Sequence, residues 1–219
     1  MYEPMWLRMY RVVFGVLALV AVVRSFPRWD EGGTADFFSM FTYQSNTFEG
    51  LVLLGGAFLA PAVISSVGWD RMRGAAVMYG VTTFVVYGVL LDGFYNPFTS
   101  DHYWTSTVLH QVIPIALVLE LILRPFANRL GPRTILIWMI YPLAFVAYSL
   151  IRGEITGWYP YDFLDPNESG GYGPVALTSI AITAGFLVVG SLIVWLSRRH
   201  HRPVTSAVEQ PAMKPAMPG

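Results

Sequence analysis

The sequence predicts an all-α protein, a polytopic integral membrane bundle of six transmembrane helices with both termini in the cytoplasm. Of the 219 residues, 54% are hydrophobic and 13% are charged. The mean hydropathy is positive, as is typical of polytopic membrane proteins and not of soluble domains. Six apolar stretches are long enough, at about 1.5 Å per residue, to cross a hydrocarbon core of roughly 30 Å.

The six predicted helices follow one another through short connections. Their ranges are 6–24, 37–63, 74–92, 105–124, 133–151 and 174–196. The connecting segments carry Gly, Pro and charged residues, which favour turns. Four examples are Arg24-Ser25-Phe26-Pro27, Gly68-Trp69-Asp70-Arg71, Asn96-Pro97 and Gly131-Pro132-Arg133. No internal repeat is convincing, so residues 1–197 are predicted to form one transmembrane domain.

The first helix and the C-terminal tail each need an argument of their own. Arg8 and Arg11 precede an apolar run, as in a signal peptide. However, no small-residue cleavage pattern follows, and five more apolar stretches do, so we interpret this run as a helix. Residues 198–219 begin with a basic cluster and become a polar, Pro-containing tail. Such a segment cannot bury apolar area, and we expect it to be disordered in the cytoplasm.

The distribution of cations predicts the orientation, because positively charged loops stay in the cytoplasm. With six spans, eleven of the fourteen Lys and Arg residues fall on the side that holds both termini. The other three, Arg24, Arg28 and Arg152, share the opposite side with nine acidic residues. The zero net charge therefore conceals a strong polarity across the membrane. No solvated basic surface remains that would indicate nucleic-acid binding.

The composition also argues against cofactor and metal sites. Cysteine is absent, which removes thiol nucleophiles and thiolate ligands. The single lysine, Lys214, lies in the tail, so a Schiff base cannot form within the bundle. His110 is the one histidine inside a predicted helix, which argues against a bis-histidine haem. We therefore predict no cofactor and no metal.

Polar residues within the predicted helices are informative, because they are costly in hydrocarbon. In the second helix a polar stripe occupies positions i, i+3, i+4 and i+7, which share one helical face that should point into the bundle. A comparable stripe runs along the fourth helix, with Glu120 nearer its cytoplasmic end. The two stripes consist of Thr42, Ser45, Asn46 and Glu49, and of Thr107, His110, Gln111 and Pro114.

Thr42 and His110 stand out because they lie at matched depth. Each lies about five residues, or roughly 8 Å at helical rise, inside the outer boundary of its helix. A hydroxyl and an imidazole so placed could act as nucleophile and base. Alternatively, the threonine hydroxyl could return to a carbonyl one turn back, and the histidine could bond a neighbouring helix. Ser45 is a rival nucleophile, although no serine here lies in a G-x-S-x-G motif.

Several motifs resemble a bacterial family of membrane proteins called Pr6Pr. They are Phe41-Thr42-Tyr43-Gln44-Ser45-Asn46, His110 with Pro114, Tyr141-Pro142-Leu143 and Gly157-Trp158-Tyr159-Pro160-Tyr161. More distantly, the chain is similar to the androgen-induced gene and androgen-dependent TFPI-regulating proteins, membrane threonine hydrolases that cleave fatty acid esters of hydroxy fatty acids. The first resemblance covers most of residues 6–196 and implies a bacterial cytoplasmic membrane. The second rests on topology and two residues.

The resemblance implies a threonine-type lipid ester hydrolase. His110 would take the proton of Thr42 as its oxygen attacks an ester carbonyl, and water would hydrolyse the resulting acyl enzyme. By depth, Asn46, Gln111, Tyr148 or Arg152 could stabilise the oxyanion, and Asp92 could orient the imidazole. The expected partner is a membrane lipid or acyl ester.

A second hypothesis is a noncatalytic membrane protein, either a small-solute pathway or an assembly partner. Glu49 and Glu120 favour it, because intramembrane acids often mark ion or proton routes. A pathway requires a continuous polar line between them. The aromatic loop 153–173 likewise has two interpretations, a belt at the headgroup level or a lid over an outer pocket. The oligomeric state is not predicted.

Overall fold

The structure, a computed structural model, describes residues 3–26, 33–91 and 104–199. All regular secondary structure in these residues is helical. Five helices among them are long and apolar enough to cross a membrane, as expected for an integral membrane protein. They are α1 (Met5–Ser25), α5 (Val67–Leu90), the continuous helix Trp104–Leu123, α8 (Arg133–Thr156) and α9 (Tyr172–Arg199). The predicted tail lies almost wholly outside the described residues.

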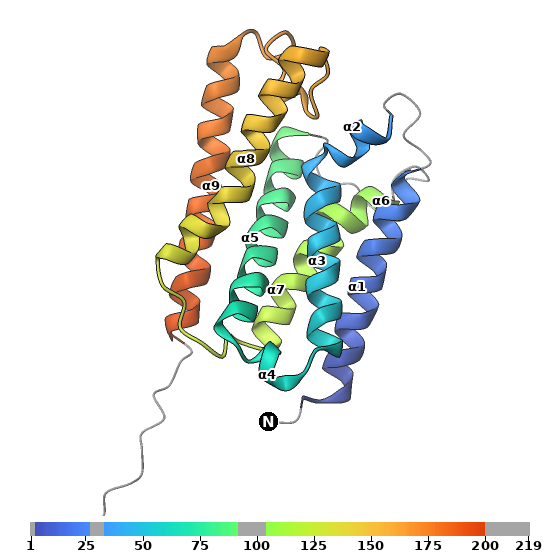
Figure 1. Cartoon of the computed structure of the whole chain (residues 1–219), viewed down its shortest axis with the longest axis vertical. Helices are drawn as coiled ribbons and strands as arrows, with labels where there is room; N and C mark the ends of the chain where they lie inside the picture. Colours follow the sequence, from blue (N-terminus) through green and yellow to red (C-terminus); the bar gives the residue numbers. More distant parts are fainter. Residues whose placement is uncertain (1–2, 27–32, 92–103, 200–219) are drawn as a thin grey trace, which may run out of the picture.

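The second predicted helix, 37–63, is divided into three. The pieces are α2 (Thr34–Phe38), α3 (Phe41–Phe58) and α4 (Pro61–Ile64). Pro61 starts α4 at a position where its missing N–H costs nothing. Helix α3 runs beside α1 between the same two ends of the bundle (Figure 1), but it is not among the helices found long and apolar enough to cross a membrane. The predicted count of six spans therefore stays a prediction.

The predicted turn at residues 68–71 is wrong, because these residues belong to the first turns of α5. The hydroxyl of Ser66 caps this helix by accepting the Trp69 backbone N–H at 3.1 Å. Asp70 accepts hydrogen bonds from the backbone and side-chain nitrogens of Asn128 at 2.8 and 2.9 Å. The polar residues that suggested a turn are thus satisfied by a cap and by a distant loop.

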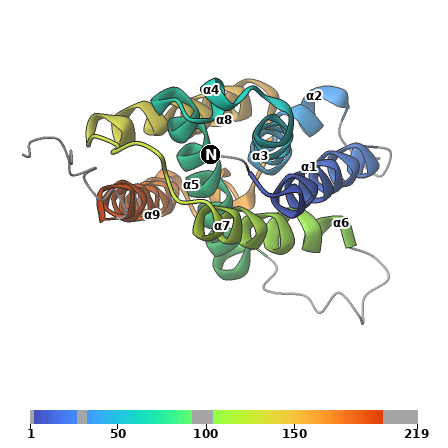
Figure 2. The ribbon, with the colours of Figure 1, turned by 90° about the horizontal axis from the view of Figure 1, so that it is seen from below.

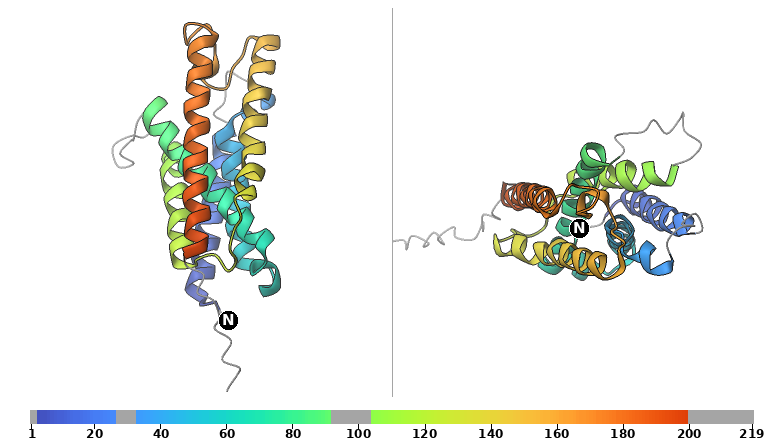
Figure 3. Two further views of the ribbon diagram at one scale, coloured as in Figure 1. Left: turned by 90° about the vertical axis from the view of Figure 1, so that its left-hand side faces the viewer. Right: turned by 90° about the horizontal axis from the view of Figure 1, so that it is seen from above.

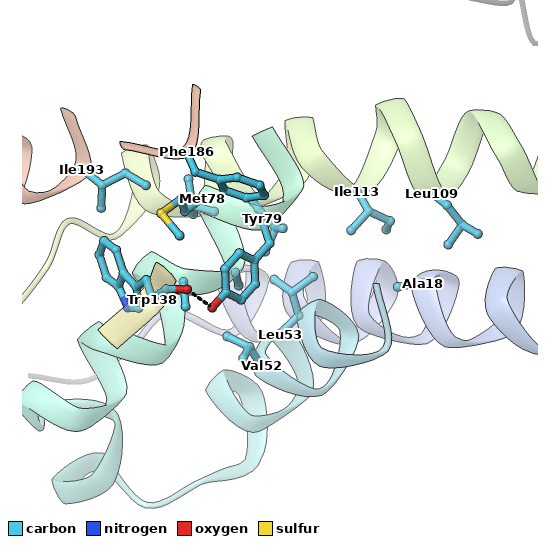
Figure 4. Packing of buried hydrophobic residues seen from close by; sticks show 14 of the residues in the cluster. Ala18, Val52, Leu53, Met78, Tyr79, Leu109, Ile113, Trp138, Phe186 and Ile193 are labelled. Carbon is cyan, nitrogen blue, oxygen red and sulfur yellow. Dashed lines mark hydrogen bonds between the residues drawn. The ribbon is translucent and has the colours of Figure 1, made fainter. Parts of the chain in front are cut away.

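Helix α5 lies in the middle of the bundle, with α3, α7 (Ile113–Leu123) and α9 around it (Figure 2). Its inward face carries Met78 and Tyr79, which pack with Phe186 of α9 in the main core. The Tyr79 hydroxyl donates to the Trp138 carbonyl of α8 at 2.9 Å (Figure 4). Tyr79 and Phe186 also join Phe41 and Tyr141 in one aromatic cluster, which ties α3, α5, α8 and α9 together.

A buried ionic network holds the end of the bundle at which α1 begins, called here the N-terminal end. The two carboxylate oxygens of Glu120 bind Arg11 of α1 at 2.6 Å and Arg73 of α5 at 2.7 Å. Arg11 also pairs with Glu3 at 2.7 Å, and Arg73 with Asp70 at 3.4 Å. Two arginines that the sequence analysis counted among the charges flanking the helices are therefore almost fully buried.

The opposite end, called here the loop end, is formed by the connection between α8 and α9 (Figure 1). Helix α8 continues to Thr156, and Gly157 ends it in the left-handed conformation with φ 73°. The short 3₁₀-helix η3 (Asp162–Leu164) follows. Leu164 packs with Phe145 and Val175 in a second, smaller core. The predicted long loop is thus shorter than 153–173 and docks between α8 and α9.

Candidate active site at Thr42 and His110

Thr42 and His110 meet inside the bundle near its loop end. The Thr42 Oγ1 and His110 Nε2 atoms lie 3.2 Å apart. Thr42 belongs to the first turn of α3 and is 7% exposed. His110 lies in the π-helix η2 (Val108–Val112), between α6 (Trp104–Thr107) and α7. A π-helical turn often occurs at a functional position within a longer helix.

The other ring nitrogen of His110 determines which tautomer faces Thr42. Nδ1 lies 2.9 Å from the Ser106 carbonyl oxygen and 3.1 Å from the Ser106 hydroxyl. Because a carbonyl only accepts hydrogen bonds, Nδ1 carries the proton. Nε2 is then an acceptor directed at Thr42 Oγ1. The imidazole also stacks on the Tyr87 ring, with centroids 3.9 Å apart and planes 14° apart, and the Ser106 hydroxyl donates to the Tyr87 oxygen at 3.0 Å.

Tyr161, which the sequence analysis did not select, contributes a third polar group. Its hydroxyl oxygen lies 3.4 Å from Thr42 Oγ1 and accepts the Thr42 backbone N–H at 3.3 Å. The backbone N–H of Phe41 also interacts with the same phenol. The Tyr161 hydroxyl therefore sits at the N-terminus of α3, where free N–H groups and the helix dipole favour negative charge.

Thr42, His110 and Tyr161 all line one cavity of about 70 Å³, called here the site cavity. Side chains of α3, α5, α8, α9 and the α8–α9 connection form its walls. These walls are mainly apolar, with Phe145, Val146, Phe163, Leu164, Ile182 and Phe186 among the lining residues. A hydroxyl and an acceptor nitrogen thus face an apolar interior space, a setting that suits a substrate with an acyl chain.

The supporting residues predicted by depth lie elsewhere. Among the described residues that line the site cavity, none of the four oxyanion candidates is present. The Asn46 amide donates to the Thr42 carbonyl at 3.0 Å, and Tyr148 bonds the Ser39 hydroxyl at 2.7 Å. Arg152 pairs with Asp36, and Gln111 belongs to η2. Asp92 lies outside the described residues, and the Ser106 carbonyl holds the imidazole instead.

The polar stripe on α3 faces inward, as predicted, with all four residues buried. Ser45, the rival nucleophile, donates to the Thr42 carbonyl at 3.3 Å. Glu49 is fully buried, and within the described part of the chain neither of its carboxyl oxygens has a hydrogen-bond partner. The stripe therefore supplies one residue, Thr42, to the site cavity.

Comparison of the chain with protein-family models, with curated proteins and with solved structures found no match.

Proposed function

We propose that this protein is a membrane-embedded ester hydrolase that uses Thr42 as nucleophile and His110 as base, acting on lipid or other acyl esters. The observation that carries the proposal is the 3.2 Å contact between Thr42 Oγ1 and the unprotonated His110 Nε2 in an apolar cavity. A nucleophile and a base within hydrogen-bond reach, with the base oriented by a third group, is the arrangement that nucleophilic catalysis needs. Here the Ser106 carbonyl supplies that orientation.

The reaction proceeds through an acyl enzyme. Thr42 Oγ1 attacks the ester carbonyl carbon while its proton passes to His110 Nε2, and the carbonyl oxygen becomes an oxyanion. The intermediate collapses as the C–O bond to the leaving alcohol breaks, and Nε2 returns the proton to that oxygen. Water then attacks the Thr42 ester through the same proton transfers, which releases the acid and restores the hydroxyl.

Tyr161 is suited to stabilise the oxyanion. Its phenol oxygen accepts the Thr42 backbone N–H, which leaves its own proton to be donated. Burial raises the pKa of Tyr161, and hydrogen bonds from Thr42 and Phe41 lower it only in part. The phenol is therefore protonated at neutral pH and donates a hydrogen bond.

The contacts of the two buried glutamates give less support to the noncatalytic alternative. A polar pathway requires a continuous line from Glu49 to Glu120. Glu120 is instead held by two arginines, and Glu49 has no hydrogen-bond partner among the described residues. The cavity of about 10 Å³ beside Glu120 is small, and the charged groups in its lining are Glu120 and the two arginines that hold it; the other lining residues are Val52, Leu53, Gly56, Trp69, Val77 and Leu117. A polar pathway is therefore the alternative outcome of the labelling and hydrolysis experiment below.

The test combines covalent labelling with hydrolysis. The purified protein in detergent is treated with a fluorophosphonate probe and, separately, with fluorogenic acyl esters. We expect the probe to modify Thr42, Thr42→Val to abolish labelling and turnover, and Thr42→Ser to retain both. His110→Gln should lower both rates by about 10²–10⁴-fold. Thr47→Val is the matched control, because the Thr47 hydroxyl bonds a carbonyl one turn back on the same helix at 2.7 Å.

Two results would overturn the proposal. Full turnover in Thr42→Val would show that another group is the nucleophile. A folded wild-type protein that takes no label and cleaves no ester across chain lengths and pH would favour the noncatalytic alternative.

A further inference from the structure

A groove on the membrane-facing side of the bundle lies next to the site cavity. It has a volume of about 210 Å³ and is lined by residues 82–90 of α5 and 181–189 of α9. Figure 3 shows the cause in its left view, where α5 passes behind α9 and its Leu90 end leans away from α9. Two helices that cross at an angle separate on either side of the crossing, which leaves a wedge between them.

The groove and the site cavity share three lining residues, Thr82, Val86 and Ile182. The side chains of these three residues therefore form a single layer between the groove and the site cavity. At its outer margin the groove is exposed, with Val85 49% and Val89 74% exposed. The three shared residues thus lie between the bilayer and the cavity that contains Thr42.

The lining of the groove is aliphatic apart from one hydroxyl. That hydroxyl, on Thr82, is already used, because it donates to the Met78 carbonyl at 2.9 Å. The groove therefore presents no unused polar side-chain group of its lining residues. An apolar, elongated space of this kind suits a hydrocarbon chain and not a lipid headgroup.

The loop end of the cavity is covered. Tyr161, Phe163 and Leu164 of the α8–α9 connection line the cavity from this side. Leu164 is buried against Phe145 and Val175, and the Tyr161 and Phe163 rings stack with centroids 5.1 Å apart. An acyl chain that approaches the site cavity from the loop end therefore meets packed aromatic side chains. One that approaches through the groove meets aliphatic side chains.

We propose that the groove between α5 and α9 binds the acyl chain of the ester substrate and admits it laterally from the bilayer to Thr42. This inference rests on the proposed function and adds where the acyl chain of the ester binds and by which route it reaches the site. The residues that determine chain length are then those that line the groove, Gly185 among them.

Gly185 gives a sharp test. A Cβ built at Gly185 meets no heavy atom within 4 Å, so this position is open, and we expect a phenylalanine there to occupy the groove. Ala184→Phe is the matched control, since Ala184 is the exposed neighbour on the same helix and does not line the groove. We expect Gly185→Phe to lower the ratio of long-chain to short-chain ester hydrolysis about tenfold or more, and Ala184→Phe to leave it unchanged.

A binding measurement separates this inference from the proposed function. Thr42→Val is incubated with a diazirine-bearing long-chain fatty acid, irradiated and mapped by mass spectrometry. We expect crosslinks in residues 82–90 and 181–189 that excess unlabelled fatty acid suppresses and that Gly185→Phe removes. If wild-type protein cleaves no ester but these crosslinks appear, the groove stands and the hydrolase proposal fails.

Two outcomes contradict the groove proposal itself. One is hydrolysis by wild-type protein with an unchanged chain-length ratio in Gly185→Phe. The other is crosslinking that is equal on all lipid-facing helices and is not suppressed by competition, which indicates annular lipid.

Discussion

Tyr161 is the residue through which the loop end of the molecule reaches the candidate site. Its hydroxyl contacts both the side chain and the backbone N–H of Thr42, although 119 positions separate the two residues in sequence. Helical periodicity cannot predict such a contact, because the position of a loop residue depends on how the loop docks. What the sequence did show was a concentration of aromatic residues in this loop, without indicating which one turns inward.

Removing the Tyr161 hydroxyl should lower activity and leave the fold intact. In Tyr161→Phe the ring still stacks on Phe163, while the hydrogen bond offered to the oxyanion is lost. We expect the rate of Thr42 phosphonylation by the fluorophosphonate to fall about 10²–10³-fold, while the protein keeps a cooperative melting transition. Tyr172→Phe is the control, because that hydroxyl bonds Glu154 at an exposed position. Equal rates for Tyr161→Phe and the control would assign the oxyanion donor to another group.

Two buried glutamates should respond differently to the same substitution. Glu120→Gln leaves Arg11 and Arg73 buried without their shared carboxylate, which typically destabilises by about 3–5 kcal/mol. Glu49→Gln removes a carboxyl group that has no partner within the described residues, so we expect the melting temperature to stay equal or rise. Thermal unfolding in detergent measures both. A large loss of stability in Glu49→Gln would reveal a partner for that carboxyl group.

At the scale of elements, the α8–α9 connection is held against α8 by close aromatic packing. A Cβ at Gly153 would lie 2.1 Å from the Tyr159 ring, so this ring rests directly on the backbone of α8. The ring is 6 positions from Gly153 along the chain and 2 from Tyr161. The position of Tyr161 near Thr42 therefore depends on the absence of a side chain at Gly153.

Substitution at Gly153 should loosen the connection without unfolding the bundle. In Gly153→Leu the Tyr159 ring is displaced, and Tyr161 moves away from Thr42 with it. We expect faster hydrogen exchange in residues 158–164 and a slower acylation of Thr42. Gly173→Leu serves as the control, since a Cβ there meets nothing within 4 Å. Unchanged exchange in Gly153→Leu would mean that the loop is held by η3 alone.

The helices themselves were largely predictable, and the errors have physical causes. Five of the six predicted stretches correspond to long apolar helices, because a continuous apolar run signals a span regardless of its partners. The range 37–63 was predicted as one helix, but Pro61 begins a separate one. The turn predicted at 68–71 failed because Asp70 is satisfied by Asn128, a contact between residues that are distant in sequence.

The proximity of Thr42 and His110 could be predicted from helix geometry. Helical rise sets the depth of a residue, and two inward-facing residues at one depth in neighbouring helices come together. The groups that orient them were not predictable. Ser106 lies one turn from His110, but its carbonyl reaches Nδ1 in a helix that is locally π-helical, and nothing in the residue pattern distinguishes such a turn from an α-helical one.

For the whole molecule, the described chain begins and ends at the same end of the bundle (Figure 1). We expect α3 to cross the membrane as well, because an even number of crossings produces this arrangement. We expect reporter fusions at both termini to give a cytoplasmic signal, because most of the described arginines outside the buried network lie at that end and only Arg24 and Arg152 among them lie at the loop end. A reporter inserted after Gly170, in the α8–α9 connection, should give the opposite signal. Opposite signals from the two termini would exclude α3 as a span.

The ionic network at the N-terminal end also constrains how the protein is made. Arg11 and Arg73 leave the ribosome before Glu120, which pairs with both. Glu3 and Asp70 each pair with one of these arginines earlier, but the carboxylate that joins the two is still missing. Because an arginine facing hydrocarbon is costly, we expect α1 and α5 to stay close to each other or to the insertion machinery until α7 is synthesised. Assembly is therefore expected to be concerted and late, and truncation before Glu120 should yield chains that are extracted and degraded.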